Sequence, residues 1–142
     1  MVTGIAHLAI TVKDMEKSLD FYTRILGFKK AFEMPNRSTG EPWIVYLHIK
    51  KNQFLELFYH GERDNPWDAS LRGFNHICLE IDDIQGMVKH IEDSGWKIDQ
   101  ALKQGGDKNL QAWISDPDGV RIELMQISPE SPQGKIAAGL PL

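Results

Sequence analysis

The sequence predicts an α+β fold made of two similar modules, each containing a strand, a helix and further strands. Residues 4–14 and 73–83 align, 69 positions apart, with glycine, histidine and the final aspartate in common. A helical pattern follows each aspartate, and strand-like segments then return with Glu56 and Glu123 at equivalent places, 67 positions apart. An internal repeat of this kind is the signature of a duplicated unit. Helical and strand patterns within each repeat favour a mixed architecture.

A helix is expected in each half between an aspartate that starts it and a glycine that ends it. Apolar residues recur at helical spacing over residues 15–26 and again over residues 84–91. Aspartate is a favoured N-cap, and glycine readily takes the left-handed conformation that ends a helix. The expected caps are Asp14 and Asp83 at the starts, with Gly27 and Gly95 at the ends.

Strand-like sequence follows each helix, and the turn Asp116–Gly119 has the Asp-Pro-Asp-Gly composition that favours a tight turn before the last strand. We predict strands at residues 43–49, 53–58, 110–114 and 120–125, and loops at 30–42 and 100–110 that shape the pocket.

These elements predict one domain over residues 1–127, with module 1 at about 3–60 and module 2 at about 73–127. Breaker residues mark 60–72 as the connection between the modules. Residues 128–142 form a proline-containing C-terminal extension that is expected to run over the surface or onto a partner.

Composition narrows the class of protein. With 42% hydrophobic and 25% charged residues, the chain has the profile of a globular domain rather than a disordered one. Its formal net charge of -4 argues against binding nucleic acid, which favours a basic surface. No apolar stretch approaches the roughly 20 residues of a membrane span, and no signal peptide is evident. The single cysteine, Cys78, excludes an internal disulfide, so a cytoplasmic location is expected, with Cys78 as a structural thiol.

Four polar residues occupy strand positions where apolar residues are the norm. Glu56 and Glu123 each lie within an apolar strand segment, where an unpaired carboxylate is costly. Arg121 is able to pair with Glu123, whereas nothing local pairs with Glu56. His7 and His76 begin apolar strands at equivalent repeat positions. A single such histidine is usually a core residue, but two, each matched by a glutamate, give a nitrogen and oxygen donor set that suits a first-row divalent metal ion.

The ordered set of motifs resembles the vicinal-oxygen-chelate superfamily, also called the glyoxalase, bleomycin-resistance and dioxygenase superfamily. The resemblance extends from Gly4 to Gln126. It is carried by Gly-Ile-Ala-His-Leu around His7, the helix phrase Asp20–Phe28, Leu-Glu-Leu around Glu56, Gly-Phe-Asn-His-Ile around His76, and Asp116–Gly119 leading to Ile-Glu-Leu around Glu123.

The resemblance implies two βαβββ modules that form a U-shaped, eight-stranded mixed sheet around a metal site. The ligand set is similar to that of glyoxalase I, which implies that His7, Glu56, His76 and Glu123 bind one divalent ion, either nickel, zinc, cobalt or manganese. The implied reaction isomerises or lyses a small substrate with vicinal oxygens, as lactoylglutathione lyase does. A proton is transferred through a metal-bound enediolate, with Glu123 as the base and Glu56 assisting.

Three alternatives remain open at this point: an epimerase of the methylmalonyl-CoA type, an extradiol-type dioxygenase, and a metal-free drug-binding protein.

Two positions depart from bacterial glyoxalase I. Thr11 stands where an arginine helps to bind glutathione, and His60 replaces an asparagine. His60 and Trp113 are the two further residues that we consider for the pocket, although Trp113 also suits the core.

The predicted sheet also leaves edges exposed, which favours a homodimer. Ile136, Leu140 and Leu142 in the extension are candidate anchors on a partner chain. The four ligands are supplied either by one chain or by two, and the sequence is compatible with both arrangements.

Overall fold

The computed structural model describes residues 1–70 and 72–142 and divides the chain into two compact units, Met1–Asn65 and Pro66–Leu142. Each unit contains one four-stranded mixed sheet with the helix expected for its module. The predicted α+β fold of two βαβββ modules is therefore confirmed. Across the described ranges, no helix is long and apolar enough to cross a membrane.

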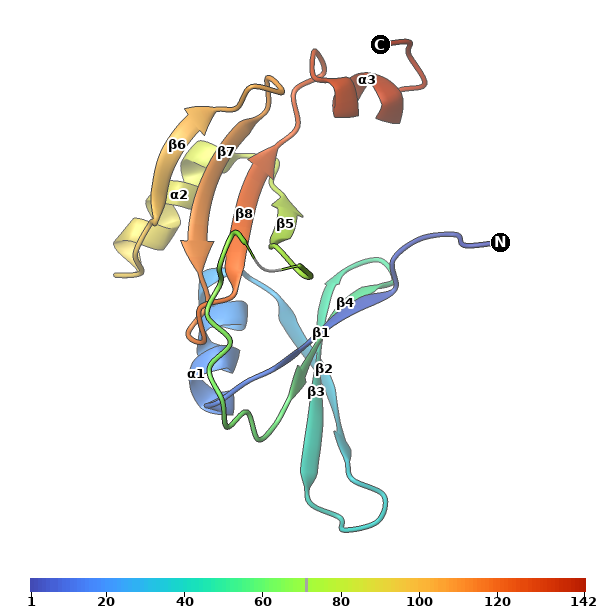
Figure 1. The fold of residues 1–142 in the computed structure, drawn as a ribbon, viewed down its shortest axis with the longest axis vertical. Coiled ribbons are helices and arrows are strands. Elements are labelled where there is room, and N and C mark those ends of the chain that lie inside the picture. Colours follow the sequence, from blue (N-terminus) through green and yellow to red (C-terminus); the bar gives the residue numbers. More distant parts are fainter. Residues whose placement is uncertain (71) are drawn as a thin grey trace. The chain divides into compact units, whose positions relative to one another are not determined.

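The first unit has the strand order β1-β4-β3-β2, with β1 parallel to β4 and the other pairs antiparallel (Figure 1). Its elements are β1 (His7–Thr11), α1 (Met15–Asp20), the π-helical turn η1 (Phe21–Ile25), β2 (Lys29–Pro35), β3 (Pro42–Lys50) and β4 (Gln53–Phe58).

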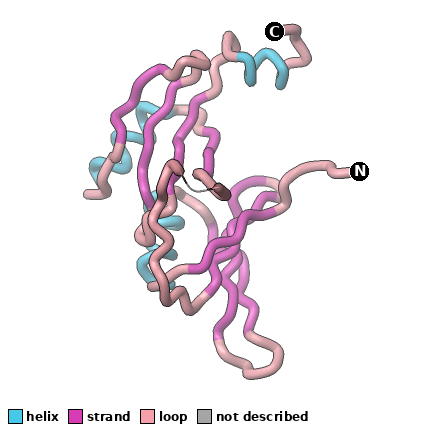
Figure 2. Tube along the Cα trace, in the orientation of Figure 1, coloured by secondary structure: helices cyan, strands magenta, loops and turns pink. Residues whose placement is uncertain are grey.

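The second unit repeats this topology with the order β5-β8-β7-β6 and a parallel β5–β8 pair. Residues 59–70 and 72–76, between the last strand of one unit and the first of the next, contain no helix or strand (Figure 2). The elements are β5 (Ile77–Glu80), α2 (Ile84–Asp93), β6 (Gln100–Gln104), β7 (Leu110–Ser115), β8 (Arg121–Gln126) and α3 (Pro132–Ala137).

Two segments predicted as loops contain strands instead. β2 falls largely within the expected loop 30–42, and β6 lies within the expected loop 100–110. Both are edge strands with register shifts against their neighbours, so neither shows the regular alternation from which a strand is recognised. Tertiary pairing with β3 and β7 fixes their conformation, and these segments cannot change shape as free loops would.

The predicted helix caps are confirmed. The side chains of Asp14 and Asp83 each accept a hydrogen bond from a backbone N–H of the first turn, at 3.1 and 3.0 Å. Gly27 and Gly95 have φ values of 75° and 79°, the left-handed conformation that ends a helix.

The first helix departs from the prediction because its second half is a π-helical turn. The Leu26 amide donates to the Phe21 carbonyl at 3.1 Å, which is a step of five residues rather than four. The Thr23 hydroxyl donates to the Leu19 carbonyl at 2.6 Å and so competes with the backbone for that acceptor. This competition gives a local physical reason for the wider turn.

Both sheets have one buried apolar face, and the site glutamates project from the other face. Strand residues alternate between faces, so Glu56 points away from its buried neighbours Leu55 and Leu57. Glu123 points away from Ile122 and Leu124 in the same way. In the second unit α2 packs on β7 and β8 (Figure 1). Fully buried side chains there also include Ile84, Ile91 and Ile114, while Val45 and Leu47 line the first unit's core.

The C-terminal extension, residues 128–142, contains the helix α3. Ser131 caps α3 by accepting a hydrogen bond from the Gly134 amide at 2.9 Å, and Pro132 occupies the first turn, where its missing N–H costs nothing. A Cβ on Gly134 would lie 2.2 Å from the Ser128 carbonyl oxygen, so only glycine permits this close approach.

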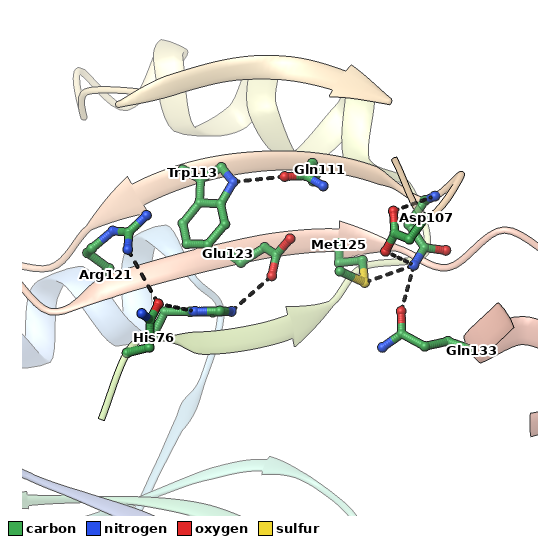
Figure 3. A network of polar contacts seen from close by, with 10 residues as sticks. His76, Asp107, Gln111, Trp113, Arg121, Glu123, Met125 and Gln133 are labelled. Carbon is green, nitrogen blue, oxygen red and sulfur yellow. Dashed lines mark hydrogen bonds and ion pairs between the residues drawn. The ribbon is translucent and has the colours of Figure 1, made fainter. Parts of the chain in front are cut away.

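Asn109, at the end of the loop before β7, ties the extension to the second unit. Its side chain is fully buried and donates to Gln133 Oε1 at 2.6 Å and to Asp107 Oδ2 at 2.7 Å (Figure 3). Its own Oδ1 accepts a hydrogen bond from the Ser128 amide at 2.9 Å. The start of α3 is therefore held through one buried amide side chain.

Candidate metal centre

The second unit brings His76 and Glu123 together. His76 immediately precedes β5, Glu123 lies in the middle of β8, and His76 Nε2 is 3.1 Å from Glu123 Oε2 (Figure 3). Only 6% of Glu123 is exposed, so its carboxylate is largely removed from water. A buried carboxylate of this kind needs a charged partner, and a neutral imidazole compensates its charge only in part.

Asn75 orients the imidazole of His76. Asn75 Oδ1 lies 2.8 Å from His76 Nδ1, and an amide oxygen is an acceptor, so Nδ1 carries the proton in this contact. Nε2 faces the Glu123 carboxylate at 3.1 Å, and it is the nitrogen that would bind a metal ion in place of that contact. Metal-binding histidines usually donate their second ring nitrogen in this way, which fixes the tautomer and the orientation of the ring.

Arg121 does not pair with Glu123, although the sequence allowed that pair. Its guanidinium carbon lies 4.0 Å from the centre of the Trp67 ring and 4.5 Å from the centre of the Trp113 ring. Arg121 Nη1 also donates to Asn75 Oδ1 at 3.4 Å (Figure 3). The cation is therefore held beside the His76–Glu123 pair by aromatic faces rather than by a carboxylate.

Trp113 lies beside the His76–Glu123 pair. Its ring centre is 4.8 Å from that of His76 in an edge-on arrangement, and its Nε1 donates to Gln111 Oε1 at 3.1 Å. Trp113 also stands opposite Glu123 in the β7–β8 register. One face of the second sheet thus presents the imidazole, the carboxylate and the indole together.

Cys78 stands opposite Glu123 in the parallel β5–β8 register. The residue is exposed, because alternation places it on the face of Glu123 rather than on the apolar face. Desolvation of the thiol, and then the neighbouring Glu123 carboxylate, raise the pKa of Cys78 to about 12. The thiol is therefore protonated near neutral pH, which agrees with an inert rather than a nucleophilic cysteine.

The first unit brings His7 and Glu56 together in the equivalent arrangement. His7 begins β1, Glu56 lies in the middle of β4, and His7 Nδ1 is 3.4 Å from Glu56 Oε1. Glu56 is as buried as Glu123, with 6% exposed. Tyr46 faces Glu56 across the β3–β4 pair. Burial, and then hydrogen bonding to Glu56, raise the pKa of the Tyr46 phenol. A neighbouring strand thus supplies the polar contact that sequence neighbours of Glu56 do not.

The four predicted ligands form two His–Glu pairs, one in each unit. Each pair offers one imidazole nitrogen and one buried carboxylate oxygen, a donor chemistry that fits a first-row divalent ion. Within residues 1–70 and 72–142, no group of three or more histidine, cysteine, aspartate or glutamate side chains could by itself hold a metal ion. The structure thus describes two separate His–Glu pairs, one in each unit.

Sequence reasoning missed three residues that contact the predicted ligands or their neighbours. Asn75 precedes His76 directly, so its polar side chain next to a candidate ligand is a usable signal. Tyr46 becomes recognisable only once the β3–β4 register is known. Trp67 lies in the connecting segment, and its stacking on Arg121 has no local signal. Of the two positions that depart from bacterial glyoxalase I, Thr11 ends β1 and His60 is exposed, with a φ of 71°.

Two βαβββ modules, each presenting a histidine and a buried glutamate at matched positions, define a duplicated protein of the vicinal-oxygen-chelate class. The chain belongs to the Glyoxalase/Bleomycin resistance protein/Dioxygenase superfamily, whose family model matches residues 4–124.

Among its relatives is a probable lactoylglutathione lyase of Synechocystis sp., 33% identical over 129 residues, with 87% of this chain and 95% of the relative covered. A lactoylglutathione lyase of Pseudomonas putida is 30% identical over 153 residues, with 87% and 84% covered.

Solved structures share the fold. A glyoxalase family protein from Enterococcus faecalis superposes with a TM-score of 0.75 at 22% identity, over 87% of this chain and 97% of that chain. An antibiotic binding protein from a Streptomyces species superposes with a TM-score of 0.68 at 24% identity, over 89% and 98% of the two chains. The same fold therefore occurs in proteins that are described as having different functions, and the function of this chain has to be argued from its site.

Proposed function

We propose that His7, Glu56, His76 and Glu123 bind one divalent metal ion, and that the protein is a metal-dependent isomerising lyase of the lactoylglutathione lyase type. Its substrate is a small molecule with two vicinal oxygens. The observation that carries this proposal is the matched pair of buried carboxylates, each beside a histidine. A bound cation compensates both carboxylates at once and gives one physical reason for the repetition.

A divalent ion held by these four residues would supply Lewis-acid polarisation of the substrate. Glu123 removes the proton from the carbon next to the carbonyl, which gives an enediolate, and the proton is then delivered to the neighbouring carbon. Glu56 is the second carboxylate that assists this transfer. The two carboxylates have different neighbours. Glu56 forms a hydrogen bond with Tyr46, whereas Glu123 lies beside Cys78. Non-equivalent surroundings favour different roles for two otherwise similar carboxylates.

Relatives named lactoylglutathione lyase at about 30% identity favour this reaction over the epimerase, dioxygenase and metal-free alternatives. Glutathione is a poor candidate for the co-substrate, because Thr11 carries no cationic group and His60 replaces an amide.

We also propose a cytoplasmic homodimer, since the single cysteine suits a reducing compartment and both sheets end in edge strands.

Elemental analysis of protein purified without a tag tests the metal site. The wild type is expected to hold one divalent ion for each set of four ligands. His76→Ala and Glu56→Ala should each lose most of it, because each removes a donor from a different unit. His90→Ala is the matched control, since His90 is exposed on α2 and lies outside the proposed set. Wild-type protein that takes up no ion, or a His90→Ala variant that loses it equally, would refute the proposed centre.

An activity screen against hemithioacetals and 2-oxoaldehydes tests the reaction. Turnover that requires the metal and disappears in Glu123→Gln supports proton transfer by that carboxylate. Metal-dependent oxygen uptake in its place would assign the protein to the dioxygenases.

A further inference from the structure

We propose that Arg121 is the specificity-determining residue of the site and binds a carboxylate on the part of the substrate away from the reacting carbons. This inference rests on the proposed function for the reacting part, and Arg121 adds a second requirement that the substrate be an anion. Arg121 lies two positions before Glu123 on the same face of β8. It also shares the acceptor Asn75 Oδ1 with His76.

The geometry around Arg121 leaves its hydrogen-bonding edge available. The guanidinium carbon lies over the rings of Trp67 and Trp113, at 4.0 and 4.5 Å from the ring centres. Such contacts between a cation and aromatic rings limit the movement of the group but use none of its five N–H donors in hydrogen bonds. Its one hydrogen bond to a described residue is the 3.4 Å contact with Asn75. No ion pair joins Arg121 to a carboxylate of residues 1–70 or 72–142.

A fixed guanidinium with unused donors suits a carboxylate, because the fork of N–H groups matches the two carboxylate oxygens. The aromatic faces also reduce the entropy lost on binding, since the side chain is already held in place. The formal net charge of -4 makes the chain as a whole a poor attractor of anions, so the preference depends on this local cation. If the contact of Arg121 with Trp67 and Trp113 is only structural, replacing Arg121 should lower the stability of the protein without changing its preference for anionic over neutral ligands.

Matched ligands separate the two interpretations. The acid probe is 3-(methylthio)propanoate and the neutral control is its methyl ester, with binding followed by calorimetry and by the fluorescence of the tryptophans that flank Arg121. Wild-type protein should bind the acid at least about tenfold more tightly than the ester, the scale of a charge-assisted hydrogen bond. In Arg121→Met the ratio of the Kd for the ester to the Kd for the acid should fall to about one. Arg37→Met removes the same charge from an exposed loop position of the first unit and should keep the wild-type preference.

Turnover provides a second measurement. The hemithioacetals of methylglyoxal with 3-mercaptopropionate and with 2-mercaptoethanol differ in one carboxylate, and the ratio of their kcat/KM values should favour the former in wild type and approach one in Arg121→Met. Arg121→Gln gives the same test if the Met variant does not fold. Equal binding of acid and ester by wild-type protein, or a preference retained without Arg121, overturns the inference. Metal content measured on the same samples reports on the proposed centre separately, so a failure of one proposal is not mistaken for failure of the other.

Discussion

Asn109 gives a quantitative test of how the extension is held. Asn109→Ala removes the hydrogen bonds to Asp107 and Gln133, and it leaves the Ser128 amide without its acceptor. Each such bond contributes about 0.5–1.5 kcal/mol net, and an unsatisfied amide adds to the loss. We therefore expect the free energy of unfolding to fall by about 2–4 kcal/mol. With a urea m-value of about 2 kcal/mol per molar, the midpoint should fall by about 1–2 M.

Urea unfolding followed by circular dichroism measures this loss, and limited trypsin digestion reports on the extension itself. Cleavage after Lys135, which lies in α3, should be faster in Asn109→Ala than in wild type, because the helix is less often docked. Asn52→Ala, at an exposed turn between β3 and β4, is the control and should change stability by less than about 0.5 kcal/mol. An Asn109→Ala protein with the wild-type midpoint and digestion rate would show that this network contributes nothing to stability.

Four further predictions concern the site and the assembly. Glu123→Gln should keep the fold and much of the metal affinity but lose turnover by roughly 10²–10⁴-fold, because an amide accepts no proton; full activity would remove Glu123 from the role of base. The glutathione hemithioacetal of methylglyoxal should react with a kcat/KM well below ~10⁶ M⁻¹s⁻¹, and a value above it would mean that Thr11 and His60 do not hinder that substrate. Sedimentation at micromolar concentration should give about twice the 16.2 kDa chain mass, which a clean monomer would contradict. When His7→Ala chains are mixed with His76→Ala chains, metal binding should return if the two ligand pairs of a site come from different chains. If metal binding does not return, all four ligands come from one chain.

The repeat made much of the fold predictable from the sequence. Asp14, Asp83, Gly27 and Gly95 act locally, since caps depend on bonds to neighbouring residues, and all four take their expected roles. β2 and β6 escaped recognition because their pairing is irregular and is imposed by the adjacent strands. No helix was predicted at α3, although Ser131 and Pro132 form a recognisable start; the prolines of the extension indicated only that it does not continue the sheet.

The two His–Glu pairs were predictable to the extent that alternation and duplication determine which residues share a face. Glu56 and Glu123 follow from their positions in apolar strands, and each contacts the histidine of its own repeat. The contacts of Arg121 were not predictable. The sequence places Glu123 near it, whereas the residue that it contacts, Trp67, belongs to the segment that connects the modules. Choosing between an ion pair and a stack requires three-dimensional packing that local spacing does not contain.

The sheet edges differ in a way that matters for handling the protein. Lysines, a terminal proline and register shifts interrupt β2, and Lys103 with a register shift interrupts β6; features of this kind block the addition of a foreign strand. The edge at β1 reads His-Leu-Ala-Ile-Thr, with no charged lysine or carboxylate, no proline and no register shift, whereas β5 has only four residues and ends in Glu80. Aggregation of damaged or partly unfolded protein should therefore begin at β1. A lysine placed on β1 is the first substitution to try in a preparation that precipitates on storage.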